Sequence, residues 1–247
     1  MTRSFSAPPG FLVLLLVALG ACDEGFADDL HGTSDADLPS GPEHAPVFGH
    51  CEPSDDGTSD PFADCVEELA AAQGVSFGHD AMPDIVLGAP AGEGPSMGGT
   101  DVVSLGCGGA ITLAFDAPWP TDGPGPDLLV FENAFVAGST RFVEPAQVLV
   151  SEDGQRWHAF PCEPDGLEPL PTGCAGLEPV LAYDEPTALD PATAGGDAFD
   201  LADLGLSQAR YVRIVDRTRE HYGSETWCAG ATGGFDLDAV VALGVAP

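Results

Sequence analysis

Residues 147–160 read Gln-Val-Leu-Val-Ser-Glu-Asp-Gly-Gln-Arg-Trp-His-Ala-Phe. Two runs rich in apolar residues, 147–151 and 156–160, lie on either side of Asp153-Gly154. This dipeptide suits the tight turn of a hairpin, because both central residues of such a turn need positive φ. The stretch therefore predicts two antiparallel strands joined by a short turn.

Similar short runs, bounded by Gly, Pro and Asp, follow one another along most of the chain, as is typical of strands. They cover residues 85–87, 101–105, 110–115, 128–131, 209–215 and 235–243. With the hairpin they make about eight strands, which favours an antiparallel β-sandwich or jelly roll. No linker stands out after residue 75, so we expect one domain from 47 to 247.

One helix is predicted at residues 61–73. Asp60 can cap it, Pro61 occupies the first helical position, and Gly74 follows the last. Between them, apolar residues recur at three- and four-residue steps and form one stripe. The stripe consists of Phe62, Cys65, Val66, Leu69 and Ala70. The expected fold is therefore mainly β with one short N-terminal helix.

Residues 1–21 have the pattern of a secretory signal peptide, with Arg3 ahead of an apolar run at 11–19 that is too short to span a bilayer. The next residues, Leu19-Gly20-Ala21-Cys22, resemble a bacterial lipobox, in which the cysteine is acylated and becomes the mature N-terminus. We therefore expect an exported protein that a lipid anchors to the bacterial membrane without spanning it. An ordinary cleavable signal followed by a chance cysteine is the alternative. Residues 22–46 are expected to form a flexible, acidic tether.

The charge balance excludes some classes of partner. The chain has 247 residues, with 7 Lys+Arg against 40 Asp+Glu and a formal net charge of −33. A surface that binds nucleic acid or anionic lipid needs clustered cations, so this balance argues against both. Hydrophobic residues make up 44% of the chain, which is enough for a sizeable core. The composition is that of an acidic globular domain.

The cysteines beyond Cys22 indicate a disulfide framework. There are six, and an even number in an exported chain implies three disulfides. Local spacing favours Cys51–Cys65 and Cys162–Cys174, which leaves Cys107–Cys228 to join distant strands. A zinc site is the alternative, but no Cys-x₂-Cys or paired-histidine spacing accompanies these cysteines.

Several segments of the chain have sequences that also occur in other proteins. They are residues 83–88, 104–109, 127–133, 148–154 with Trp157, 199–203 and 235–240. Together they resemble a family of poorly characterised bacterial exported and cell-surface proteins. The hairpin at 148–157 and the strand at 210–214 also look like those of galactose-binding-like jelly rolls, which include discoidin domains and carbohydrate-binding modules. The resemblance implies this fold, which hosts sugar binding, protein docking, lipid binding and spacer roles.

Acidic residues that interrupt strand-like apolar runs indicate a cation site, because burying an unpaired carboxylate is costly. Calcium takes six to eight oxygen ligands from carboxylates, Asn side chains and carbonyls on bent loops. Asp236 and Asp238 alternate onto one face of their strand. A chain this acidic also produces such spacings by chance. We expect a structural calcium ion held by Glu132, Asn133, Asp236, Asp238 and Asp200, the last in a Gly-rich loop with Asp197.

Aromatic residues and arginines indicate a ligand face. Sugars stack on aromatic rings and bond to charged or amide groups, and four of the arginines fall between residues 210 and 219. The alternative is that the aromatic residues fill the core and the arginines pair with carboxylates. We expect Trp157 in the core and 218–232 to be an exposed loop. The ligand-binding residues are expected to be Trp119, Trp227, Tyr222 and Arg219.

Catalysis is not expected, since the sequence has no nucleophile elbow, HExxH motif or P-loop. The sequence predicts a membrane-anchored, surface-exposed lipoprotein with a calcium-stabilised binding module for a glycan or another extracellular ligand. One alternative is a structural or protein-docking module with no small ligand. The other is a glycosidase-like hydrolase, which needs two carboxylates facing each other across a cleft.

Overall fold

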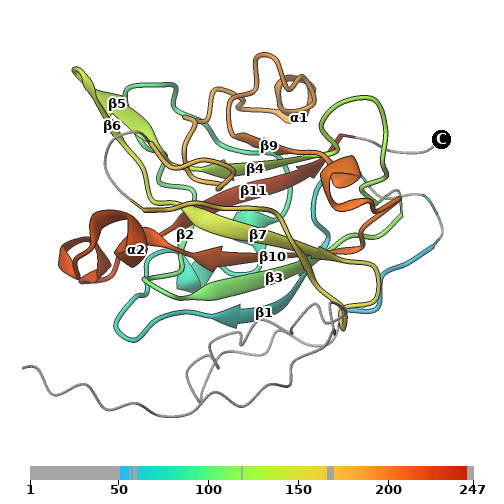
Figure 1. Cartoon of the computed structure of the whole chain (residues 1–247), viewed down its shortest axis with the longest axis horizontal. Coiled ribbons are helices and arrows are strands. Elements are labelled where there is room, and N and C mark those ends of the chain that lie inside the picture. The colour runs from blue at the N-terminus through green and yellow to red at the C-terminus, as the bar shows by residue number, and fades with distance from the viewer. Residues whose placement is uncertain (1–50, 56, 58–59, 118, 166–169, 244–247) are drawn as a thin grey trace, which may run out of the picture. The chain divides into compact units, whose positions relative to one another are not determined.

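Antiparallel sheets form the framework of this computed structural model, which describes residues 51–55, 57, 60–117, 119–165 and 170–243. In the first sheet the strand order is β1 (Cys65–Ala70), β3 (Ala110–Ala114), β10 (Tyr211–Asp216), β7 (Ala146–Ser151) and β8 (His158–Ala159). In the second it is β2 (Val103–Ser104), β11 (Asp236–Ala242), β4 (Leu128–Glu132) and β9 (Asp197–Phe199). A separate hairpin, β5 (Phe135–Ala137) with β6 (Thr140–Phe142), stands at one side (Figure 1).

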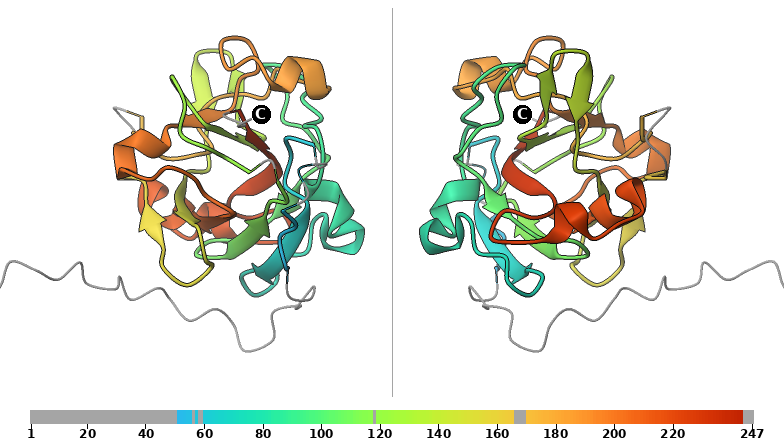
Figure 2. Two further views of the ribbon diagram at one scale, coloured as in Figure 1. Left: turned by 90° about the vertical axis from the view of Figure 1, so that its right-hand side faces the viewer. Right: turned by 90° about the vertical axis from the view of Figure 1, so that its left-hand side faces the viewer.

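Helical turns are short and lie around the outside of the sheets (Figure 2). The α-helices are α1 (Glu185–Ala188) and α2 (Thr218–Tyr222). The 3-10 turns are η1 (His79–Ala81), η2 (Asp84–Val86), η3 (Leu201–Leu204) and η4 (Thr226–Cys228). Within the described ranges, no helix has the length and apolar character needed to cross a membrane.

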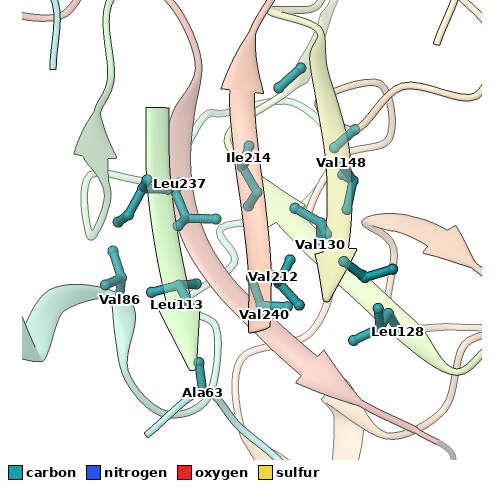
Figure 3. Packing of buried hydrophobic residues seen from close by; sticks show 14 of the residues in the cluster. Ala63, Val86, Leu113, Leu128, Val130, Val148, Val212, Ile214, Leu237 and Val240 are labelled. Carbon is teal, nitrogen blue, oxygen red and sulfur yellow. The ribbon is translucent and has the colours of Figure 1, made fainter. Parts of the chain in front are cut away.

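The two larger sheets face each other across one hydrophobic core (Figure 3). Val212 and Ile214 of β10 point into it, and Arg213 between them points outward and pairs with Glu68 at 3.6 Å. This alternation is what a half-buried strand requires. Leu128, Val130, Leu237 and Val240 supply the facing side from β4 and β11. The structure therefore confirms the prediction of a mainly β protein with antiparallel sheets.

The predicted helix at 61–73 is wrong, because this segment contains β1. Asp60 does accept the backbone N–H of Phe62 at 2.9 Å, but no helix follows. β1 pairs with β3, and its register shifts between Val66 and Glu68, which marks a β-bulge. The bulge lets Val66 and Leu69 both face the core at a spacing of three residues, which imitates a helical period.

Two further expectations change in detail. Of the predicted strand 85–87, residues 85 and 86 fall on the 3-10 turn η2 and residue 87 follows it; Val86 packs into the core. The hairpin of β7 and β8 forms, with Val150 opposite His158, but a wider loop replaces the tight turn. The Asp153 carboxylate holds this loop by accepting the backbone N–H groups of Gln155 and Arg156, both at 2.8 Å.

Trp157 does not enter the core between the sheets. It is half-buried and packs against Tyr211 and Leu149 on the outer face of the first sheet.

All six cysteines of the described part of the chain are paired, as the spacing argument expected. The disulfides are Cys51–Cys65, Cys107–Cys228 and Cys162–Cys174, at sequence separations of 14, 121 and 12. The signal peptide at 1–21, acylation at Cys22 and the tether at 22–46 lie outside the described residues.

Candidate functional site

Three carboxylates converge where the second sheet meets the β5–β6 hairpin. Glu132 is the last residue of β4, Asp236 is the first of β11, and Glu144 follows β6. The pairing of Leu237 with Glu132 brings Asp236 next to Glu132 on the neighbouring strand. One oxygen from each of the three lies within 4.8 Å of the others, and all three side chains are buried. We call these three residues the acidic cluster.

Glu132 is the most isolated member of the acidic cluster. Its side chain is 0% exposed, and neither carboxylate oxygen has a hydrogen-bond partner among the described residues. Burial raises its pKa well above the usual range, and the neighbouring carboxylates of Glu144 and Asp236 raise it further. The backbone N–H of Ala134 favours the charged form, but it does not reach hydrogen-bond geometry.

The other two members differ in their surroundings. Ser104 Oγ donates a short hydrogen bond to one oxygen of Asp236, and Asn133 Nδ2 donates to the other at 3.2 Å. Burial raises the pKa of Asp236 to about 6, and these donors limit the rise. Burial and the nearby charge of Asp236 raise the pKa of Glu144 to about 10. Within the described residues, no ion pair includes a member of the acidic cluster.

Each of the three residues offers a carboxylate oxygen, and such a set can hold a metal ion. The structure brings together three of the five predicted ligands, Glu132, Asn133 and Asp236. Asn133 lies there as a hydrogen-bond donor to Asp236. Sequence reasoning missed Glu144, although the segment Phe142-Val143-Glu144-Pro145 shows the same signal, an acid within an apolar run.

Asp238 and Asp200 lie elsewhere. Asp238 is the extra residue of a β-bulge in β11, and both of its oxygens accept the backbone N–H of Ala91 at 3.1 Å. Asp200 caps η3 by accepting the N–H of Ala202 at 2.9 Å. It belongs to a second group of acids, with Asp122 and Asp127. The prediction that one ion unites all five residues is therefore wrong for these two.

A groove of about 800 Å³ lies beside the β5–β6 hairpin. Four aromatic rings contact one another along it: Phe135 with Phe142 at 5.0 Å, Phe142 with Trp227 at 5.2 Å, and Trp227 with Tyr222 at 5.2 Å. Arg141 and His221 add polar groups to the lining. Trp227 is 43% exposed, so the groove presents an aromatic surface to solvent. We call this the aromatic groove.

Two of the four predicted ligand residues line the aromatic groove, Tyr222 and Trp227. Trp119 lies elsewhere, with its ring under the guanidinium of Arg210 at 3.8 Å and its indole N–H donated to Gln208. Arg219 pairs with Glu225 at 2.6 Å instead of lining the groove. The segment 218–232, expected as an exposed loop, contains α2 and η4 and is mostly exposed.

The aromatic groove and the acidic cluster are neighbours. A second cavity, of about 330 Å³, is lined by Glu144, Asp236 and Asn133, and also by Phe135 and Phe142 from the groove. The hydroxyl of Tyr222 donates to the carbonyl of Val143 at 2.9 Å, directly before Glu144 in the chain. Phe135 and Phe142 thus separate an acidic cavity from an aromatic one.

A scan against protein-family models finds no match for the chain, and searches of curated proteins and of solved structures find none either.

Proposed function

We propose that the protein is a binding module for an extracellular glycan, and that the glycan lies in the aromatic groove. The observation that carries this proposal is the partly exposed ring of Trp227, backed by Tyr222 and Phe142. Large exposed aromatic residues in a concave site commonly mark a ligand. Sugar rings place their apolar faces on such surfaces, and the groove has the volume to hold more than one of them.

The polar lining of the groove suits a neutral ligand better than an anionic one. Arg141 is the cation there, and it already pairs with Glu178 and donates to the carbonyl of Leu177 at 3.0 Å. A net charge of −33 also repels anions. Hydroxyl groups of a neutral glycan can bond to the outer edge of Arg141 and to backbone groups of the β5–β6 turn. We therefore favour neutral over acidic glycans.

The wider setting belongs to the same proposal. The sandwich would be a jelly roll of the galactose-binding-like kind, stabilised by calcium and held at the cell surface or on the periplasmic side of a membrane through acylated Cys22. Three disulfides support export, because such bonds persist in oxidising compartments. No catalytic step is part of the proposal.

Glycan binding is tested on arrays of neutral polysaccharides, followed by calorimetry with the best ligand. Trp227→Ala should weaken binding about 30-fold, since truncating a central interface tryptophan commonly costs about 2 kcal/mol or more. Tyr183→Ala is the matched control, because Tyr183 is exposed but lies outside the groove, and it should leave the affinity unchanged.

The same assay separates the alternatives. If the folded protein binds no glycan, a structural or protein-docking module replaces this proposal. If the glycan is bound and cleaved, the module is a hydrolase. Equal affinities for the wild type and Trp227→Ala would remove the aromatic groove as the site.

A further inference from the structure

Glu132 has surroundings that a carboxyl group does not tolerate without a partner. It is fully buried, its two oxygens lack hydrogen bonds, and the described part of the chain gives it no ion pair. Buried polar groups are nearly always bonded, and buried charges are paired or coordinate metals. Glu144 and Asp236 each place a carboxylate oxygen within 4.8 Å of one of its own oxygens. A single cation would supply a partner to all three carboxylates at once.

The geometry of the acidic cluster matches a calcium ion. Calcium–oxygen distances of about 2.3 to 2.6 Å put opposite ligands about 4.6 to 5.2 Å apart. The three carboxylate oxygens lie within 4.8 Å of one another, so they can share one such ion. Magnesium is usually bound by only one or two carboxylates and keeps its water molecules. The adjoining cavity of about 330 Å³ gives an entry path and room for water ligands.

The second group of acids lacks these features. Asp127 is buried, but its oxygens already accept the backbone N–H groups of Leu201 at 2.8 Å and Gly123 at 2.9 Å. Asp122 is exposed and Asp200 is half-buried. Nothing there leaves a buried carboxylate without a partner.

We propose that Glu132, Glu144 and Asp236 hold one calcium ion, and that this ion fixes both ends of the β5–β6 hairpin and thereby shapes the aromatic groove. The hairpin begins at Phe135, three residues after Glu132, and ends at Phe142, two residues before Glu144. Asp236 ties the ion to β11 in the second sheet. Without the ion, nothing links Glu132 and Glu144 at the two ends of the hairpin to Asp236, and the hairpin loses this attachment to β11.

Phe135 and Phe142 extend this effect to the groove. Both rings line the acidic cavity on one side and the groove on the other, and Phe142 contacts Trp227. Movement of the hairpin therefore changes the surface that the glycan contacts. The link to glycan affinity rests on the proposed function, whereas the ion site and its effect on the groove do not.

The ion site is tested by calorimetry and by metal analysis of the full folded domain, after treatment with a chelator and dialysis. The wild type should bind one calcium ion per chain, and saturating calcium should raise Tm by about 10 °C. Glu132→Gln should weaken calcium binding about 100-fold or more, and in chelator it should be at least as stable as the wild type. The matched control, Asp200→Asn, should bind calcium as the wild type does.

Two results would overturn the ion site. One is a folded wild type that binds no calcium, and the other is tight binding by Glu132→Gln. If Glu132→Gln does not fold, Glu144→Gln serves as the second variant with the same expected loss, and the wild-type measurement stands in any case.

The effect on the groove is followed by the fluorescence of Trp227 in a protein with Trp119→Phe and Trp157→Phe. Removing calcium should shift the emission of Trp227 to longer wavelength and increase its quenching by acrylamide. Adding calcium should reverse both changes, and the titration should give the same calcium affinity as calorimetry. Calcium binding without any change at Trp227 would overturn the link. If glycan binding is never found but Trp227 responds, the proposed function fails and this inference stands. If both hold, chelator should weaken glycan binding about tenfold or more.

Discussion

At the scale of single residues, burial raises the pKa of several carboxyl groups, and Asp197 of β9 is an example. It accepts the backbone N–H of Leu177 at 2.9 Å, yet burial raises its pKa to about 7. In the unfolded chain the pKa is near 3.8. The folded protein therefore binds this proton more tightly than the unfolded chain does. The resulting contribution to the free energy of unfolding is full below pH 3.8, and it is lost as the pH rises to about 7.

Asp197→Asn tests this contribution, because Asn keeps an oxygen for Leu177 and does not titrate. In urea denaturation without metal ions, the wild type should lose stability relative to the variant between pH 4 and 7. The total difference should reach up to about 4 kcal/mol, at about 1.4 kcal/mol per pKa unit. Stability curves that run parallel over this range would show that Asp197 titrates normally.

At the scale of elements, β-bulges explain which sequence predictions failed. A bulge at Glu67 turns the alternation of β1 into a spacing of three residues, so the segment looked helical. A bulge at Asp238 likewise puts Leu237 and Val240 in the core three residues apart, and Asp238 bonds to Ala91 instead of joining Asp236. Regular strands such as β3, β4 and β10 were predictable from their apolar runs. The position of a β-bulge depends on how a strand pairs with its partner strand. The apolar pattern of one strand alone therefore does not reveal it.

Asp216, at the end of β10, bonds to three separate segments of the chain. Its oxygens accept the backbone N–H groups of Gly108 and Phe235, both at 2.8 Å, and the hydroxyl of Thr218 at 2.6 Å. Asp216→Ala leaves these buried donors unpaired, so it should lower the free energy of unfolding by about 3 kcal/mol or more. Urea denaturation measures the loss. Asp203→Ala, at an exposed acid, should change it by less than about 0.5 kcal/mol. Similar values for the two variants would refute the role of Asp216.

At the scale of the whole molecule, the sequence predicted the strands of the sheets and the disulfide pairs, but only two of the three residues of the acidic cluster and two of the four rings of the aromatic groove. Glu132 and Asp236 were predicted as ligands, because acids in apolar runs signal burial. Glu144 reaches them only through the return of the β5–β6 hairpin, which was not predicted. The rings of Tyr222 and Trp227 were predicted too, but their partners Phe135 and Phe142 come from that same hairpin. Both sites thus depend on one short element with little sequence signal.

The disulfides allow a final test at this scale. Cys107–Cys228 closes a loop of 121 residues and holds η4, which carries Trp227, against the turn after β2. Loop-closure entropy gives about 5 kcal/mol for this bond and about 3 kcal/mol for Cys162–Cys174, at a separation of 12. Replacing each pair with serine should therefore destabilise the protein more for 107 and 228 than for 162 and 174, measured by guanidinium denaturation. Only the first replacement should also alter Trp227 fluorescence in the folded state. Equal losses of stability would mean that Cys107–Cys228 constrains the unfolded chain no more than the shorter bridge does. An unchanged Trp227 signal would mean that Cys107–Cys228 does not position the aromatic groove.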